Sequence, residues 1–254
     1  MSKQGRSSAN YGNWVSTRII LAPAALALIC ALLSILWVYL LIPAGIFFLS
    51  AAYFTYARYL FSPAGRNIQN RIRKLVIDNL DWDGKGSALD IGCGSGAMAI
   101  DIAKGNPSAT IMATDYWGGN WEYSQKTCQE NAQEENVGER VRFQRASASG
   151  LPFDDGQFDA VVSNLVFHEV KDSANKMSLI KEALRVLKKG GKFSLQDLFH
   201  LERMYGKPED ILATVRNWGV EKVEFVDTKN SSFIPGALRL PFMVGTLGLI
   251  KGVK

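Results

Sequence analysis

The stretch Ala88-Leu-Asp-Ile-Gly-Cys-Gly-Ser-Gly96 decides how this chain folds, because a short apolar strand there runs into three glycines at alternate positions. A helix-forming run follows over residues 97–103. Glycine carries no side chain and tolerates positive φ, so the backbone of such a turn can approach a ligand closely. Asp90, at the mouth of the turn, can accept hydrogen bonds from a ligand amine or hydroxyl. These residues predict a strand, turn and helix that hold a nucleoside-like cofactor.

The glycines by themselves leave three interpretations open. The first is the nucleoside-like cofactor. The second is a dinucleotide, because the same residues fit G-x-G-x-x-A. The third is a tight strand-to-helix turn that binds no ligand. Asp115 ends the next predicted strand, about 20 residues further on, where a carboxylate can accept both ribose hydroxyls. Asp is also a good helix N-cap, which is the alternative role for this residue.

Strands and helices alternate along the rest of the chain. Strands are expected over residues 87–91, 110–114, 141–145, 158–163 and 191–196, with helices between them, notably over 121–135 and 178–187. This alternation predicts an α/β fold with a doubly wound parallel sheet covered by helices on both faces. In such sheets ligands bind at the carboxyl ends of the strands, near the switch in strand order.

Charge is distributed unevenly along the 254 residues, which carry a formal net charge of +5. No acidic residue precedes Asp78, whereas the remainder is nearly balanced. The basic character therefore belongs to the N-terminal part, which argues against a nucleic-acid binder. Three distant cysteines form neither zinc spacing nor a disulfide framework, and no carboxylate cluster suggests a metal.

Residues 19–57 contain no charged side chain, and about 20 apolar residues span a bilayer as a helix. We predict an N-terminal transmembrane helical hairpin, with helices over 19–41 and 45–60 and a turn at Pro43-Ala-Gly45. The second helix is short, so a re-entrant or interfacial helix is an alternative, as is a hairpin buried in a soluble protein. Basic residues flank both ends, which predicts that both lie on the cytoplasmic face of the cell membrane.

Four regions follow from these patterns: a basic tail over 1–18, the hairpin over 19–60, a basic amphipathic linker helix within 61–83 and a catalytic domain over 84–254. Basic residues of the linker could rest on anionic membrane lipids.

Several segments, in this order, resemble the class I S-adenosylmethionine-dependent methyltransferases. The resemblance covers residues 78–254 and rests on residues 89–96, Asp115, Leu151-Pro-Phe-Asp-Asp-Gly-Gln-Phe-Asp159, Val161-Val-Ser-Asn-Leu-Val-Phe-His168 and Glu182-Ala-Leu-Arg-Val-Leu-Lys-Lys-Gly-Gly-Lys192. It implies a Rossmann-like sheet of seven strands, mostly parallel, closed by strands over 220–227 and 244–251, the last of them antiparallel. The apolar connection over 233–242 is expected to dip into lipid, cover a hydrophobic substrate or fold onto the core.

The resemblance also implies a cofactor, S-adenosylmethionine, and residues that would hold it. The glycine turn would cradle the methionine end, and Asp115 would bind the ribose. Ser147 stands where relatives often carry an acidic residue that contacts adenine. The expected cofactor-binding residues are Asp90, Gly92, Cys93, Gly94, Gly96, Asp115, Tyr116, Ser147 and Asn164. Trp117 could also pack against adenine and Trp121 could line the substrate pocket, although burial in the core is the alternative for both aromatics.

Methyl transfer from a sulfonium needs a general base only when the acceptor carries a proton. His168 is the candidate, because imidazole titrates near neutral pH, with structural packing in its loop as the alternative. Glu169 could orient it, and Asp197 is a weaker candidate for substrate contact. The loop Ser163-Asn-Leu-Val166 lacks the Asn/Asp-Pro-Pro-Tyr/Phe arrangement of enzymes that methylate base amines, so no nucleic-acid partner is expected.

These observations predict a membrane-anchored methyltransferase for a lipid or hydrophobic small-molecule acceptor. Tethering a catalytic domain at the bilayer raises its effective concentration toward such an acceptor. A cofactor-binding scaffold without catalysis and a methyltransferase that modifies a membrane protein are the alternatives. The oligomeric state is left open.

Overall fold

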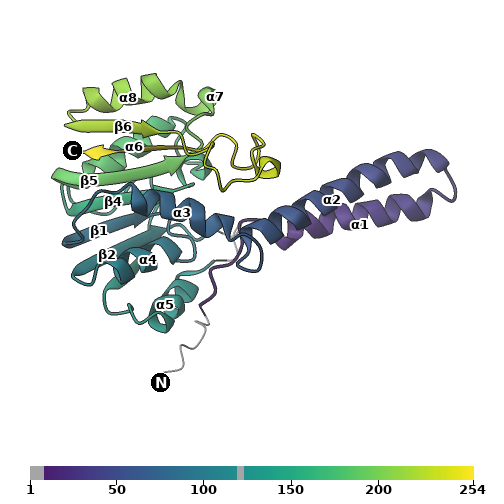
Figure 1. Ribbon diagram of the computed structural model, residues 1–254, viewed down its shortest axis with the longest axis horizontal. Helices are drawn as coiled ribbons and strands as arrows, with labels where there is room; N and C mark the ends of the chain where they lie inside the picture. The colour runs from purple at the N-terminus through teal and green to yellow at the C-terminus, as the bar shows by residue number, and fades with distance from the viewer. Residues whose placement is uncertain (1–8, 119–122) are drawn as a thin grey trace. The chain divides into compact units, whose positions relative to one another are not determined.

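The computed structural model describes residues 9–118 and 123–254 (Figure 1), which form two compact units. The larger unit contains Arg73–Lys254 together with the described residues before Asn13, and the smaller unit is Asn13–Ile72. The helix α3 (Ile68–Asp78) carries the chain from the smaller unit into the larger one.

A sheet of seven strands forms the centre of the larger unit, in the order β3-β2-β1-β4-β5-β7-β6. The strands are β1 (Gly86–Ile91), β2 (Ala109–Asp115), β3 (Val141–Arg145), β4 (Phe158–Asn164), β5 (Leu187–Asp197), β6 (Lys222–Val226) and β7 (Gly248–Val253). The first five strands pair in parallel, whereas β7 lies antiparallel between β5 and β6. The predicted Rossmann-like sheet, with its antiparallel last strand, is confirmed.

Helices follow the strands as the alternating pattern predicts. They are α4 (Ala97–Gly105), α5 (Gln125–Glu134), α6 (Lys176–Arg185), α7 (Glu202–Tyr205) and α8 (Pro208–Asn217), with short 3₁₀ turns η2 (Phe167–Glu169) and η3 (Gly236–Leu238). Neighbouring residues of a strand enter different hydrophobic clusters: Leu89 lies in one and Ala88 in the other. Because successive side chains of a strand point to opposite faces, the two clusters are the cores on the two sides of the sheet.

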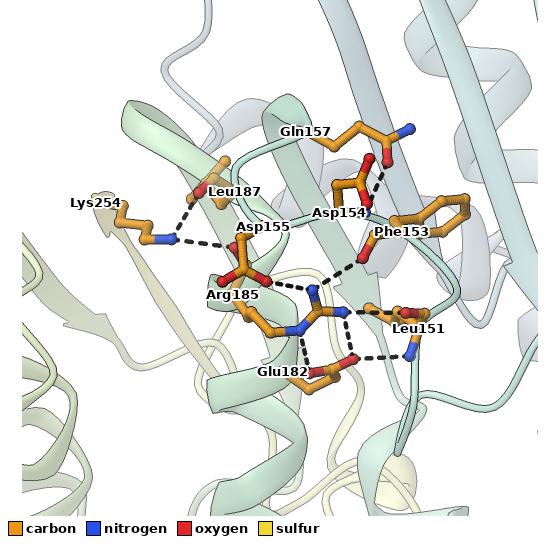
Figure 2. A network of polar contacts seen from close by, with 9 residues as sticks. All are labelled: Leu151, Phe153, Asp154, Asp155, Gln157, Glu182, Arg185, Leu187 and Lys254. Atoms are coloured by element: carbon orange, nitrogen blue, oxygen red, sulfur yellow. Dashed lines mark hydrogen bonds and ion pairs between the residues drawn. The ribbon is translucent and has the colours of Figure 1, made fainter.

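The segment after β3 is fastened to α6 by one arginine (Figure 2). The Arg185 guanidinium bonds both oxygens of Glu182, at 2.8 and 2.9 Å, and donates to the carbonyls of Leu151 and Phe153. Glu182 in turn accepts the Leu151 amide at 2.8 Å. This network fixes the loop that leads from the end of β3 to β4.

Two antiparallel helices make up most of the smaller unit, and Figure 1 shows them side by side: α1 (Thr17–Leu33) and α2 (Leu41–Phe61), joined through η1 (Val38–Leu40). The helical hairpin is thus present, but its predicted turn at Pro43 was wrong, because the chain reverses before η1. Pro43 lies in the first turn of α2, where backbone amides have no intrahelical acceptor and proline is tolerated.

The lengths of the two helices also differ from the prediction. Val38–Phe61 is long and apolar enough to cross a membrane, whereas α1, with 17 residues, is shorter. The short helix of the pair is therefore the first one, not the second. The difference has a physical origin: Pro43 does not end a helix when it stands near its start.

Apolar side chains of the smaller unit point mainly outward. Small residues are buried in the helices, among them Ala27, Ala44 and Ala51, while large ones such as Leu49, at 68% exposure, face away. Alanines let two helix backbones approach closely, as small residues do between membrane helices.

Candidate active site

The glycine turn is tied to the end of β2 through its backbone. The amides of Gly92 and Cys93 both donate to the Thr114 carbonyl, at 2.7 and 2.9 Å. Gly92 has a φ of +71°, and a Cβ there would lie 2.1 Å from Val166, in the loop after β4. Only glycine allows this turn to pack so closely against that loop.

Asp115 binds the glycine turn directly. Its Oδ2 accepts the Gly94 amide at 2.9 Å, and its Oδ1 accepts the Trp117 amide at 2.7 Å. Each carboxylate oxygen has two lone pairs, so these bonds leave acceptor positions for ribose hydroxyls. Asp115 therefore has a structural role that sequence reasoning missed, and ribose binding stays a prediction for it.

Trp117 contacts the glycine turn through its indole ring. Its indole Nε1 donates to the Gly94 carbonyl at 3.0 Å, and its ring packs against one of the two hydrophobic clusters. This agrees with burial as the role of this aromatic side chain. Trp121 lies outside the described residues.

The fit of a cofactor can be judged from Asp90 and Gly94. Both carboxylate oxygens of Asp90 are buried, and neither has a hydrogen-bond partner of good geometry within residues 9–118 and 123–254. Burial raises the pKa of Asp90 to about 7, against a smaller lowering by the nearby Ala99 amide. Among the described residues, a Cβ on Gly94 would meet only the Tyr123 ring, at 3.7 Å, so these residues leave space beside the turn. An unpaired buried carboxylate beside an open turn suits a ligand with a positively charged amine.

Cys93 is buried inside the turn. Burial raises the pKa of its thiol well above the usual range, so the thiol stays protonated. Protonated thiols are poor nucleophiles, and Cys93 therefore contributes small size to the turn. The third glycine of the turn, Gly96, has a φ of +82° and is the N-cap of α4.

Tyr116 and Ser147 lie at the ends of the neighbouring strands β2 and β3. The Ala146 amide donates to the Asp115 carbonyl at 3.0 Å, which places Ser147 one residue further along. Tyr116 is 60% exposed, and the Arg145 guanidinium carbon lies 4.7 Å from its ring centroid. An exposed ring held by a cation is available for stacking.

Asn164 ends β4 and is fixed by the next strand. Its Oδ1 accepts the Gln196 Nε2 at 2.8 Å. The residue that follows, Leu165, has a φ of +58°, and its amide donates to the Gln196 carbonyl at 2.8 Å. Positive φ at a non-glycine residue costs free energy and clusters at functional sites. The loop after β4 is therefore held in a defined conformation by β5.

His168 pairs with the carboxylate that ends β5. Its Nδ1 lies 2.7 Å from Oδ1 of Asp197, which is fully buried. Asp197 also accepts the amides of Phe167 and Leu198, at 2.8 and 2.7 Å. Glu169 lies on the other side of the ring, 3.7 Å from Nε2. Asp197, not Glu169, is thus the residue that orients the imidazole.

The electrostatics of this pair shift the pKa of the imidazole. Burial lowers the pKa of His168, but the charge of Asp197 and its hydrogen bond outweigh that effect and the net shift is upward. When Nδ1–H donates to a carboxylate, the lone pair of the neutral ring lies on Nε2. Sequence reasoning did not bring Asp197 together with His168, since residues 168 and 197 meet only through the pairing of β4 with β5.

Comparison with known proteins agrees with this geometry. Residues 89–195 match the family model described as a methyltransferase domain. The chain is 33% identical over 125 residues to "Ribosomal RNA small subunit methyltransferase C" of Haemophilus influenzae, covering 48% of this chain and 35% of that protein. It is 29% identical over 126 residues to "Ubiquinone/menaquinone biosynthesis C-methyltransferase UbiE" of Geobacter sp., covering 49% of this chain and 51% of that protein.

A solved structure shares the fold. The geranyl diphosphate C-methyltransferase of Streptomyces coelicolor, in complex with S-adenosyl-L-homocysteine, superposes with a TM-score of 0.54 at 15% identity, over 74% of this chain and 80% of that one. The chain spans about a third to a half of the length of the two curated relatives. Together with the seven-stranded sheet and the glycine turn, these findings show that the chain contains a methyltransferase domain with the Rossmann-like fold of the class I enzymes.

Proposed function

We propose that the whole protein is a membrane-anchored methyltransferase that transfers a methyl group from S-adenosylmethionine to a hydrophobic small molecule or lipid with an ionisable proton on the acceptor atom. The observation that carries this proposal is the His168–Asp197 pair, because a base in the loop after β4, held by the buried carboxylate that ends β5, serves an acceptor that must lose a proton.

The residues present divide the work between them. Asp90 and the glycine turn would hold the methionine part of the cofactor, and Asp115 would hold the ribose. Bound S-adenosylmethionine supplies an electrophilic methyl group. On transfer, the acceptor atom would form a bond to the methyl carbon while the carbon–sulfur bond breaks and the sulfur keeps the electron pair. The acceptor proton passes to Nε2 of His168, while Asp197 stabilises the imidazolium that results.

Proximity accounts for the placement of the base. The Cβ position of Gly92 lies 2.1 Å from Val166, two residues before His168, so the glycine turn and the loop of the base are in contact. Alignment of donor and acceptor is the main requirement for a displacement of this kind.

The smaller unit supports a hydrophobic acceptor. Its helices carry no charge between residues 19 and 57, and their large apolar side chains face outward. In the larger unit, the connection between β6 and β7 exposes Leu240 and Phe242, at 37% and 66%, although Leu238 in the same segment is buried. Both features suit a hydrophobic acceptor, and one relative is named for ubiquinone/menaquinone biosynthesis.

Methyl-labelled S-adenosylmethionine tests the proposal in one experiment. Membranes that contain the protein or its Asp197→Asn variant are incubated with label and separated into organic extract, protein and RNA. Label in the organic extract with the wild type alone is the expected result. Label in RNA alone, in keeping with the first relative, or in membrane protein alone overturns the hydrophobic acceptor. Calorimetric binding of S-adenosylhomocysteine without transfer to any fraction would identify a scaffold.

A further inference from the structure

Two serines after β3 meet an aspartate from a distant part of the sequence. The hydroxyls of Ser147 and Ser149 lie 2.9 and 2.7 Å from Oδ2 of Asp172, and 2.8 Å from each other. Asp172 stands in the loop between η2 and α6, about 25 residues from either serine. No sequence pattern singled out Asp172.

The cluster lies at the end of a row of expected cofactor contacts. The glycine turn follows β1, Asp115 ends β2 and Ser147 follows β3, and these three strands are consecutive neighbours in the sheet. Neighbouring strands lie about 4.8 Å apart. A ligand whose amino-acid end lies on the glycine turn and whose ribose lies on Asp115 therefore extends its base toward Ser147.

The hydrogen-bonding character of the cluster is that of an acceptor. A carboxylate offers about four lone-pair positions, and the two hydroxyls use two of them. Each serine that donates its proton to Asp172 presents only oxygen lone pairs to a ligand. Such a cluster matches an exocyclic amine, which donates two hydrogens, and opposes a carbonyl oxygen in the same place.

Both chain segments that form the cluster are fixed before any ligand binds. The Arg185–Glu182 network holds the chain at Leu151 and Phe153, just after the serines (Figure 2). Asp172 precedes α6, the helix that carries both Glu182 and Arg185. The two serine hydroxyls hold the pKa of Asp172 below its usual range, so the carboxylate is charged at neutral pH.

We infer that Asp172, positioned by Ser147 and Ser149, binds the exocyclic amine of the cofactor's adenine and makes the site selective for a 6-amino over a 6-oxo purine. The inference rests on the proposed use of S-adenosylmethionine.

Isothermal calorimetry with S-adenosylhomocysteine and its 6-oxo analogue, S-inosylhomocysteine, tests this on the full chain. The wild type is expected to bind the adenosyl compound about 10-fold more tightly, in keeping with one hydrogen bond to a charged group in a solvated site. The Asp172→Asn variant should lower this ratio to about 3 or less, because the amide of Asn can also donate to a carbonyl. The Ser147→Ala/Ser149→Ala double variant should lower the ratio by less.

Asp154→Asn is the matched control, since Asp154 is an exposed aspartate in the same connection between β3 and β4. It should keep the wild-type ratio. Equal binding of the two compounds by the wild type, or an unchanged ratio in Asp172→Asn, overturns the inference and leaves the proposed function standing. Failure of the folded wild type to bind S-adenosylhomocysteine at all contradicts the proposed function itself.

Discussion

The two units of this protein place their apolar residues in opposite ways. In the larger unit the largest apolar side chains, such as Phe193 and Phe199, are fully buried, whereas most leucines and isoleucines of α1 and α2 in the smaller unit face outward and the few buried residues of these helices are mainly alanines. Water favours the first arrangement, because burial of apolar surface stabilises a fold in water. A hydrocarbon environment favours the second, where close packing of small residues takes the place of the hydrophobic effect.

Polar groups differ between the units in the same way. The larger unit buries the carboxylates of Asp90 and Asp197. The sequence before Asp78 contains no Asp or Glu at all. Buried polar groups in a water-soluble core are costly unless they are paired, and they mark functional sites. The proposed site therefore lies in the larger unit, while α1 and α2 of the smaller unit present mainly exposed apolar side chains. Four substitutions test this contrast.

The largest effect is expected for Asp197→Asn. Loss of the carboxylate removes the partner of His168, and kcat should fall about 10²- to 10⁴-fold. The raised pKa of His168 places the acidic limb of the pH–rate profile above the usual histidine value, since the base must be neutral. In the variant this limb should move to lower pH, because the charge that raises the pKa is gone. Steady-state rates between pH 5 and 9 measure both changes.

Asp227→Asn is the control for that experiment, because Asp227 also lies near a histidine, 3.5 Å from His200, outside the proposed base pair. It should leave the profile unchanged. A normal kcat and an unmoved acidic limb in Asp197→Asn would show that His168 is not the base.

Asp90→Asn should stabilise the cofactor-free protein and weaken cofactor binding. A carboxyl whose folded pKa is about 7 still holds its proton when the unfolded chain has lost it. Stability therefore falls as pH rises from about 4 to 7, by up to about 4 kcal/mol for a shift of this size. Asn escapes this penalty, so the variant should unfold at higher urea at pH 8, and the difference should vanish near pH 4. A less stable variant at pH 8 would contradict the buried, unpaired carboxylate.

Leu49→Lys tests the smaller unit. Leu49 lies near the middle of Val38–Phe61 and is 68% exposed. A lysine at the centre of a membrane helix costs about 3 kcal/mol in insertion, so the variant should move from the carbonate-washed membrane fraction toward the supernatant. Tyr59→Lys, near the end of α2, should stay with the membrane, because a lysine there can reach the interface. Equal retention of both variants would argue against a membrane span.

Gly92→Ala should have the smallest effect of the four. Its Cβ would meet Val166 at 2.1 Å, and its φ of +71° disfavours a side chain, which together cost about 2 kcal/mol. Thermal unfolding and S-adenosylhomocysteine affinity should both decline. Gly105→Ala, at a position where a Cβ meets nothing within 4 Å, is the matched control and should change neither. Wild-type behaviour in both variants would show that the turn tolerates side chains.

Local patterns predicted most of the fold. The five parallel strands were expected within a few residues of their observed positions, because each contains a short apolar or alternating segment between turn residues. Ends set by packing were less predictable: α2 begins before Pro43, and the antiparallel β7 begins at Gly248, four residues after the expected start.

The sequence alone determined the glycine turn, the acidic residue at the end of β2 and the uncharged stretch of the smaller unit, because each depends on neighbouring residues and on local backbone preference. Only the tertiary structure decided that Asp197 orients His168 and that Asp172 meets Ser147. These pairs lie 29 and 25 residues apart, and parallel strand pairing, which no local pattern encodes, brings their loops to one edge of the sheet.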